Sequence, residues 1–316
     1  MNAVEFRAWV KPLLRRTPRT EALSYFLSLP SALELAAGPS HFLETAASSA
    51  KGLGRVKLAL ILETPPPRLA ADAAARANPR KAVAAADVLS TLAFDFGMGY
   101  DAGLLPAMTA LLQRWRLSGS LMISVDFDRS RGRFDKLSFY AYMPEGALGE
   151  LLRAFGAERL LARLAPLVER NLEFWALDLR PDGGADLKFY NREPYRPEDA
   201  PPGLRAAAAR LASLCPVRDL TRLTRVRLQN RRGRRGAPRL EPGSKAYFGF
   251  REGIGLSELA ALRPAAFRAD KHRALARALA KHAPGQRAYF LGFDGGDLEA
   301  YFDRRVRVPE PEETSR

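Results

Sequence analysis

Hydrophobic and polar residues alternate with a period of two in a series of short segments, which is typical of strands with one buried face. Several of these segments are joined by short turns, such as SRGR at 130–133 and PDGG at 181–184. Short turns make neighbouring strands antiparallel. The predicted strands cover residues 54–63, 92–98, 121–128, 134–143, 172–179, 186–192, 224–230, 245–250, 287–293 and 298–304.

Wider apolar spacing between these strands predicts helices. They cover residues 5–15, 20–29, 31–37, 70–89, 104–117, 146–170, 203–214 and 257–282. The order is a repeating unit of hairpin and helix, with four clear copies that begin near residues 120, 171, 223 and 286, and with 54–63 and 92–98 as a fifth, looser pair.

An open antiparallel sheet of this size would expose two edges, and closure removes them. The predicted fold class is therefore α+β, with a ten-stranded antiparallel barrel surrounded by helices. We expect a single domain over residues 1–308 and a disordered tail, PEPEETSR, over 309–316.

The two faces of the predicted strands differ in chemistry. One face is apolar, as in Ile123/Val125/Phe127, and we assign it to the helix layer. The other face repeats lysine and tyrosine two residues apart. Its residues are Arg55/Lys57, Ser124/Asp126, Lys136/Ser138/Tyr140/Tyr142, Lys188/Tyr190/Arg192, Arg225/Arg227, Lys245/Tyr247, Arg287/Tyr289 and Glu299/Tyr301.

If the barrel closes with this polar face inward, its lumen places several cations beside several phenols. Ammonium and guanidinium groups neutralise a diphosphate, and aromatic faces stabilise a carbocation through their quadrupoles. Lysine and tyrosine on the open face of a sheet are otherwise ordinary solvated positions. The recurrence of the pattern on three strands favours an enclosed site.

The charge supports an anionic ligand. Among 316 residues, 50 Lys and Arg face 35 Asp and Glu, a net charge of +15. The one cysteine, Cys215, excludes an internal disulfide and cysteine-based zinc or iron–sulfur sites, and we expect it to be a buried small apolar residue. No signal peptide and no apolar run of about 18 residues is present, so we expect a cytoplasmic protein without a membrane span.

Two features keep a nucleic-acid-binding β-protein open as an alternative. The segment NRRGRRGAPR at 230–239 holds five arginines, and tyrosines on a polar sheet face could stack on bases. The arginine segment could equally be a solvated loop or a loop at the barrel mouth. Because lysine and tyrosine recur in every late hairpin, the distribution suits an enclosed site better than a binding stripe.

The strands DKLSFYAY, DLKFYNRE, SKAYFGF and DLEAYFDR resemble strand motifs of the soluble aromatic prenyltransferases of the ABBA fold. The segments HFLETAASSAKGLGRVKLALILE at 41–63 and ISVDFDRSRGRFDKLSFYAYM at 123–143 are most similar to the cyanobactin-type peptide prenyltransferases. The resemblance implies a ten-stranded barrel ringed by helices in ααββ repeats. It implies transfer of a dimethylallyl, geranyl or longer group from its diphosphate, the co-substrate, to an electron-rich side chain of a peptide.

The resemblance also implies roles for single residues. Glu44 matches the glutamate that takes the acceptor's proton, and Lys57, with Arg55 beside it, matches the basic residue of the first strand. Lys136, Lys188 and Lys245 match the cations around the diphosphate, and Tyr140, Tyr190, Tyr247 and Tyr301 match the tyrosines that shield the allyl cation. The polar faces add Arg227 to the diphosphate-binding candidates and Tyr289 to the tyrosines.

Two residues depart from the family pattern. Glu299 stands where the family often has a cation, and Ser138 occupies a position at which the family has lysine, with Lys136 one step earlier on that face. Mg²⁺ is a possible cofactor, bridging the diphosphate to Asp126. We expect a monomer, and a small phenol or indole remains an alternative acceptor to a peptide.

Overall fold

The computed structural model describes residues 41–48, 52–62, 71–99, 101–115, 121–128, 133–200, 205–228, 236–241, 245–255, 258–259, 287–294 and 297–305. The predicted helices at 5–15, 20–29 and 31–37, nearly all of the one at 257–282, and the tail at 309–316 lie outside these residues.

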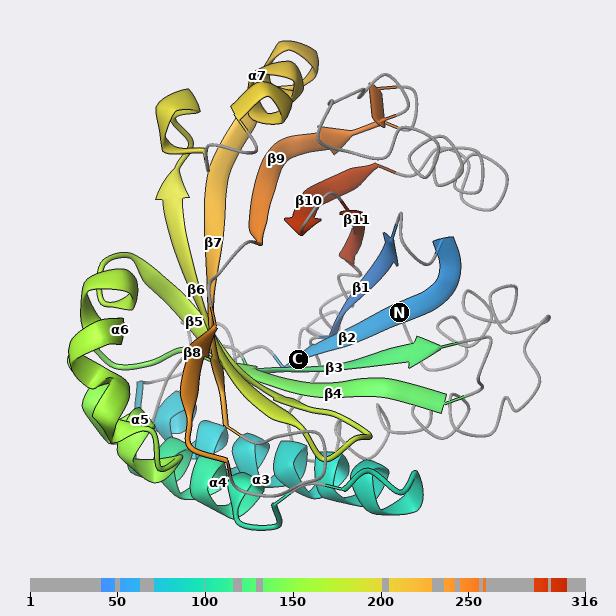
Figure 1. Cartoon of the computed structure of the whole chain (residues 1–316). Helices are drawn as coiled ribbons and strands as arrows, with labels where there is room; N and C mark the ends of the chain where they lie inside the picture. Colours follow the sequence, from blue (N-terminus) through green and yellow to red (C-terminus); the bar gives the residue numbers. More distant parts are fainter. Residues whose placement is uncertain are drawn as a thin grey trace, which may run out of the picture.

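Ten strands form a closed antiparallel ring, and each strand pairs with the next one along the chain (Figure 1). The ring consists of β1 (His41–Ser48), β2 (Gly52–Leu62), β3 (Leu121–Asp128), β4 (Arg133–Ala141), β5 (Leu172–Leu179), β6 (Ala185–Pro194), β7 (Val217–Arg227), β9 (Ala246–Ile254), β10 (Ala288–Asp294) and β11 (Asp297–Arg305). Pairing of β11 with β1 closes the ring, and the short strand β8 (Arg239–Glu241) is added to the end of β7. The predicted ten-stranded barrel is confirmed.

Helices cover the outer face of this ring. They are α3 (Ala71–Asp95), α4 (Leu104–Trp115), α5 (Leu148–Ala154), α6 (Leu161–Val168) and α7 (Arg205–Leu214), with the short 3₁₀ turns η1 (Glu158–Leu160) and η2 (Pro197–Asp199). In α4, Leu104, Met108, Leu111 and Leu112 are buried, so one stripe of the helix faces the sheet. Figure 1 shows α3 to α6 around one part of the barrel and α7 outside another.

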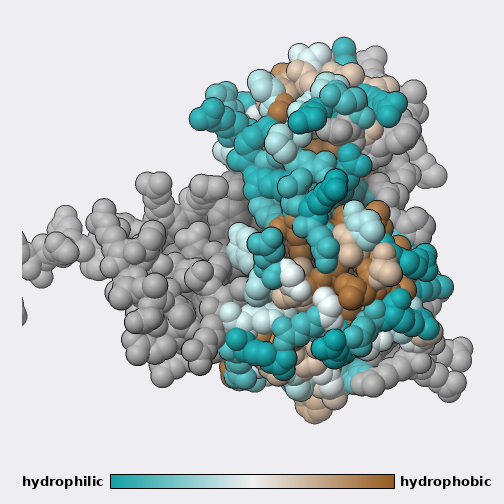
Figure 2. All heavy atoms as spheres, turned by 90° about the vertical axis from the view of Figure 1, so that its left-hand side faces the viewer, coloured by the Kyte–Doolittle hydropathy of each residue, from teal (hydrophilic) through white to brown (hydrophobic). Residues whose placement is uncertain are grey.

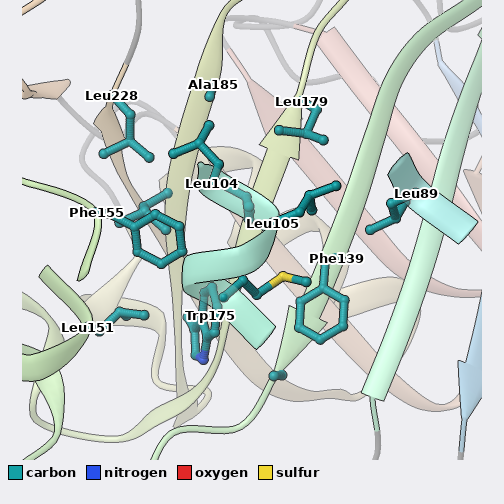
Figure 3. Close-up of a cluster of buried hydrophobic side chains, with 14 of the residues drawn as sticks. Leu89, Leu104, Leu105, Phe139, Leu151, Phe155, Trp175, Leu179, Ala185 and Leu228 are labelled. Atoms are coloured by element: carbon teal, nitrogen blue, oxygen red, sulfur yellow. The ribbon is translucent and has the colours of Figure 1, made fainter. Parts of the chain in front are cut away.

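The outward strand faces and these helices form two hydrophobic clusters. The larger one packs α3 to α6 against β3 to β6, and Figure 3 shows Trp175 and Phe139 beside helix residues such as Leu105. The smaller one packs α7 against β9, β10 and β11. The predicted assignment of apolar faces to the helix layer is confirmed at Leu137 and Phe248, among others. The core therefore lies between sheet and helices, outside the barrel.

Two sequence assignments are wrong. Residues 92–98 do not form a strand, because Leu89, Leu92 and Ala93 are buried at helical spacing and continue α3 to Asp95. The fifth hairpin is made instead by β1 and β2. The long helix predicted over 146–170 is interrupted at Gly156, whose φ of 66° lies in the left-handed region that ends a helix.

A β-bulge interrupts the alternation in β10. Ala288 pairs with Phe302, but Phe290 already pairs with Tyr301, so one extra residue lies in β10. Beyond the bulge, Leu291 and Phe293 join the outer cluster. Unbroken alternation would place Phe290 on the same outward, apolar face as Ala288, but Phe290 is only half-buried and lies outside that cluster.

The outer surface is mixed in character. Figure 2 shows a hydrophobic patch bordered by hydrophilic side chains on the side of the molecule that carries α5 and α6. Among the described residues, the large apolar side chains most exposed to solvent are Phe94, Leu167 and Tyr142. None of the described helices has the length and hydropathy needed to cross a bilayer.

Candidate functional site

The inner face of the barrel carries ionisable and aromatic side chains in successive layers. Strand β6 shows the order, because Asp186, Lys188, Tyr190 and Arg192 alternate with residues that face the helices. Lys188 and Tyr190 are both nearly fully buried. The polar face identified in the sequence therefore points inward, as the enclosed-site interpretation requires.

The first layer is an ion cluster at one end of the barrel. Asp186 has no exposed surface and pairs with both Arg180 and Arg227. Arg227 also lies 3.4 Å from Glu241 of β8, and Arg225 lies 3.7 Å from the same carboxylate. Arg227 is thus placed with carboxylates on either side of it.

The second layer joins two lysines through one carboxylate. Asp178 on β5 pairs with Lys188, and its Oδ2 atom lies 3.4 Å from Nζ of Lys136 on β4. Lys136 also lies 3.2 Å from Asp126 on β3. Asp178 is fully buried, and the Lys188 side chain is only 7 % exposed. The layer therefore holds two ammonium groups side by side on the inner face.

The charges of this layer depend on one another. Burial alone would raise the pKa of Asp178, but Lys136 and Lys188 hold it well below its ordinary value. Burial lowers the pKa of Lys188 to about 7, against the attraction of Asp178 and with the repulsion of Lys136 and Arg225. An anion bound beside these lysines would favour their protonated forms.

The third layer is a belt of aromatic rings. Phe174 stacks on Tyr190 with ring centroids 4.4 Å apart, and Tyr140 lies 6.0 Å from Tyr190. Tyr247 continues the belt at 5.9 Å from Tyr190, and Tyr301 lies 5.8 Å from Tyr247. Burial, followed by the neighbouring phenols, raises the pKa of Tyr190 well above its ordinary value. The belt thus presents electron-rich ring faces directly beside the lysines.

Lys245 links the aromatic belt to a carboxylate. It pairs with Glu299, and its Nζ lies 3.4 Å from the Tyr301 hydroxyl and 4.9 Å from the centre of the Tyr247 ring. The Tyr301 hydroxyl also donates to Glu299 at 2.5 Å. Burial opposes charge on Lys245, yet Tyr247 and Glu299 raise its pKa above its ordinary value. Glu299, the departure from the family pattern, is therefore the partner of Lys245.

The far end of the inner face is a second ion cluster. Nη1 of Arg192 lies 2.5 Å from Glu173, and its Nη2 lies 2.7 Å from Asp219. Asp219 is buried and packs over Gly249 of β9. The aromatic belt is thus flanked by ionic clusters on both sides.

The remaining predicted residues can be placed only by their positions in the strands. The structure describes only the backbone of Glu44, Arg55 and Lys57: Glu44 pairs with Ala59 and Asp303, Arg55 with Asp128, and Lys57 with Asp126. Lys57 is therefore in register with the Asp126–Lys136 pair. Tyr289 lies at the bulge of β10 and is outside the ring contacts of the belt.

Sequence reasoning missed Asp178, Asp186 and Phe174 as members of the inner face. Their place on the inner face could have been inferred, since Phe174, Ala176 and Asp178 alternate along β5 with Trp175, Leu177 and Leu179, which face the helices. Cys215 is buried as predicted, and its thiol donates to the Gly253 carbonyl oxygen at 3.4 Å.

Asp126, the residue that we considered as a metal ligand, already contacts a lysine. Its carboxylate contacts the ammonium of Lys136, which supplies positive charge where a cation would lie. Among the described residues, no group of three or more Asp, Glu, His or Cys side chains could hold a metal ion. A magnesium ion held mainly by diphosphate oxygens would need only one protein carboxylate, so the Mg²⁺ bridge to Asp126 stays a prediction.

No family model and no curated protein matches this chain. Solved structures resemble it over nearly its whole length. The 5-dimethylallyl tryptophan synthase of Streptomyces coelicolor, solved with DMASPP and Trp, has a TM-score of 0.56 and 14% identity and covers 99% of both chains. The prenyltransferase PriB, solved with L-tryptophan and dimethylallyl thiolodiphosphate, has a TM-score of 0.56 and 17% identity, covering 98% of this chain and 99% of its own.

A further structure of the Streptomyces coelicolor synthase gives a TM-score of 0.52 at 14% identity, covering 95% of this chain and 96% of that one. At such low identity the likeness shows the fold. The chain has the antiparallel barrel with external helices that these aromatic prenyltransferases share, as the sequence predicted.

Proposed function

We propose that this protein is an enzyme that transfers a prenyl group from an allylic diphosphate to an electron-rich aromatic acceptor. One observation carries the proposal: a buried layer of paired lysines lies next to a belt of tyrosines. Lys188 and Tyr190 are two residues apart on the same face of β6. An allylic diphosphate needs both surfaces, one for the leaving group and one for the cation.

The proposed mechanism is electrophilic alkylation. The bond between the allylic carbon and the diphosphate oxygen breaks, and its electron pair leaves with the diphosphate. Lys136 and Lys188 neutralise the developing negative charge, and such electrostatic stabilisation is usually the largest catalytic contribution. The faces of Tyr140, Tyr190 and Tyr247 stabilise the allylic cation and keep water from it.

The aromatic acceptor then supplies two electrons to form the new bond to the allylic carbon. The acceptor finally loses a proton, which restores its aromaticity. Glu44 remains our candidate for the base that receives this proton, a role of about 10²- to 10⁴-fold in rate for a general base. Pyrophosphate is the second product.

The proposal also concerns the class of acceptor and the length of the prenyl donor. An indole is the first candidate, because the two neighbours with bound molecules are solved with tryptophan. A peptide-borne aromatic residue is the second, because of the resemblance to the cyanobactin-type enzymes. A monomer in the cytoplasm remains our prediction for the assembly and its location.

The test combines donors of three lengths with three classes of acceptor. Dimethylallyl, geranyl and farnesyl diphosphate are each incubated with L-tryptophan, a tryptophan-containing peptide and a simple phenol. Mass spectrometry detects the added isoprenoid, and a coupled assay detects released pyrophosphate. We expect product with at least one pair. No product with any pair, together with no binding of dimethylallyl thiolodiphosphate, would overturn the proposal.

The same protein serves to test the nucleic-acid alternative. The lysines and arginines of the inner layers described above lie on the inner face of the barrel ring, where a polynucleotide has less access than a small diphosphate. We expect weak binding to heparin or RNA. Tight binding with a steep salt dependence, in a protein that releases no pyrophosphate, would favour the alternative.

A further inference from the structure

The proposed reaction alone does not explain why a carboxylate, Asp178, lies where an anionic diphosphate would bind. Asp178 is fully buried, and its own charge repels that ligand. A buried carboxylate without partners strongly destabilises the folded state, so other groups must compensate its charge. Its contacts identify these groups, because it pairs with Lys188 and lies 3.4 Å from Lys136.

We propose that Asp178 is a positioning residue that holds the ammonium groups of Lys136 and Lys188 together and protonated, ready to receive a diphosphate. The inference rests on the proposed function. Lysine has a flexible four-carbon stem, so two lysines from β4 and β6 would otherwise spread apart by repulsion. The carboxylate on β5, the strand between them, fixes both.

The surroundings of Lys188 show why it needs this partner. Two cations repel it, Lys136 on β4 and Arg225 on β7, and burial removes its hydration. Asp178 attracts the Lys188 ammonium, yet burial still leaves the pKa of Lys188 at about 7. Other ionisable groups of these inner layers are Asp126 on β3, Asp186, Tyr190 and Arg227.

Removal of the Asp178 charge should therefore move the pH dependence of diphosphate binding. Lys188 must carry a proton to bind the anion, so affinity falls about tenfold per pH unit once pH exceeds its pKa. In Asp178→Asn the attraction is gone while burial and repulsion persist. Binding should then weaken from a pH at least about one unit lower than in the wild type.

Asp186 offers a matched control. It faces Asp178 directly across the β5–β6 ladder, and both carboxylates have no exposed surface. Its partners are Arg180 and Arg227 rather than lysines, and an arginine side chain does not give up its proton in proteins. In Asp186→Asn the affinity can fall, but the pH at which binding weakens should stay that of the wild type.

The experiment measures the Kd of inorganic pyrophosphate by calorimetry between pH 6 and about 9.5 for wild type and both variants. The ligand's own titration is common to all three proteins and cancels in the comparison. Asp178→Asn combined with Lys188→Arg should regain alkaline binding, because arginine does not lose its proton. Circular dichroism checks that each variant is folded.

The outcomes separate the two proposals. If wild type binds neither pyrophosphate nor dimethylallyl thiolodiphosphate, the proposed function fails and the inference with it. If wild type binds and Asp178→Asn follows the same pH profile, only the inference fails. Should Asp178→Asn not fold, Asp178→Glu replaces it: this variant keeps the charge but displaces it by one methylene. It should bind at least about fivefold more weakly with an unchanged pH profile, and undiminished affinity would overturn the positioning role.

Discussion

Burial and charge act in opposite directions on the two ionised groups of the Asp178–Lys188 pair. Burial opposes ionisation of both side chains, yet the lysines keep Asp178 charged, whereas Lys188 remains easy to deprotonate. A lysine that gives up its proton near neutral pH weakens the folded state at low pH. The buried, protonated Lys188 thus destabilises the folded state, and an anion bound beside it would reduce this destabilisation.

This cost predicts how stability depends on pH. The folded-state pKa of Lys188 is about 7, below its ordinary value of 10.5 in the unfolded chain. Between these values the unfolded chain binds more protons, so the free energy of unfolding rises with pH. In Lys188→Arg this contribution is absent. Urea unfolding at several pH values should show the wild type gaining stability relative to the variant, and parallel curves would contradict the prediction.

Tyr190 lies at the centre of the aromatic belt, in contact with Phe174, Tyr140 and Tyr247. We expect Tyr190→Leu, which keeps apolar volume and loses the π face, to lower kcat for prenyl transfer by about 30-fold, which corresponds to about 2 kcal/mol. Tyr190→Phe keeps the ring and should retain most of the rate. Equal kcat values for both variants would exclude a role of the π face in cation stabilisation.

Single inner-face residues could be predicted from the sequence where the same residue types recur on several strands. Lysine and tyrosine recur on strands, and the structure buries Lys188, Tyr140 and Tyr190 together on the inner face. Asp178 escaped prediction because a lone carboxylate in an apolar strand has meaning only through partners from other strands. Alternation along a strand predicts which face of the sheet a residue lies on. The register between strands determines which side chains of other strands it contacts.

Among the secondary-structure elements, alternation predicted the wrong structure or the wrong face at two places, one where a helix continues and one where a strand contains an extra residue. Residues 92–98 alternate, but Leu89 and Leu92 complete the buried stripe of α3. In β10 the bulge between Ala288 and Phe290 reverses the faces, and no local signal announces it. Both errors arise because tertiary packing, rather than local pattern, selects which faces are buried.

The packing of β7 against β9 gives a prediction at this scale. A Cβ atom at Gly249 would collide with the Asp219 carboxylate, which Arg192 and Arg218 hold in place. We expect Gly249→Ala to lower the free energy of unfolding by about 1–3 kcal/mol, the usual range for overpacking. At Gly236 an added Cβ meets nothing within 4 Å, so Gly236→Ala is the control. Equal urea midpoints for the two variants would show that Asp219 moves aside freely.

For the molecule as a whole, the prediction of a closed barrel succeeded because the hairpin repeat leaves few alternatives. Ten antiparallel strands with one helix-covered face either close or expose edges. The sequence did not reveal which strands meet at closure, since that depends on the number and tilt of all strands together. It also did not reveal β8, which has only three residues.

Ring closure predicts a contrast between two proline substitutions. Val226 of β7 pairs with Leu187 of β6 within the ring, and also with Leu240 of the added strand β8. Proline at position 226 removes a ladder donor inside the ring, so Val226→Pro should abolish cooperative thermal unfolding. Leu240→Pro changes the added strand and a side chain that packs against the larger cluster, but no pairing within the ring, so it should leave a sharp transition. A sharp transition in both variants would show that the ring tolerates a break at β7.

The pairing of β1 with β11 also has a consequence for biosynthesis. Every other junction of the ring joins strands that follow one another, so most of the sheet can form while the ribosome is still translating. One edge of β1 pairs with β2, which follows directly, but the other edge, at residues 42–48, pairs only with residues 299–305. A nascent or prematurely terminated chain would therefore present the edge of β1 to other proteins, and we expect chaperones to be needed until the last strand leaves the exit tunnel.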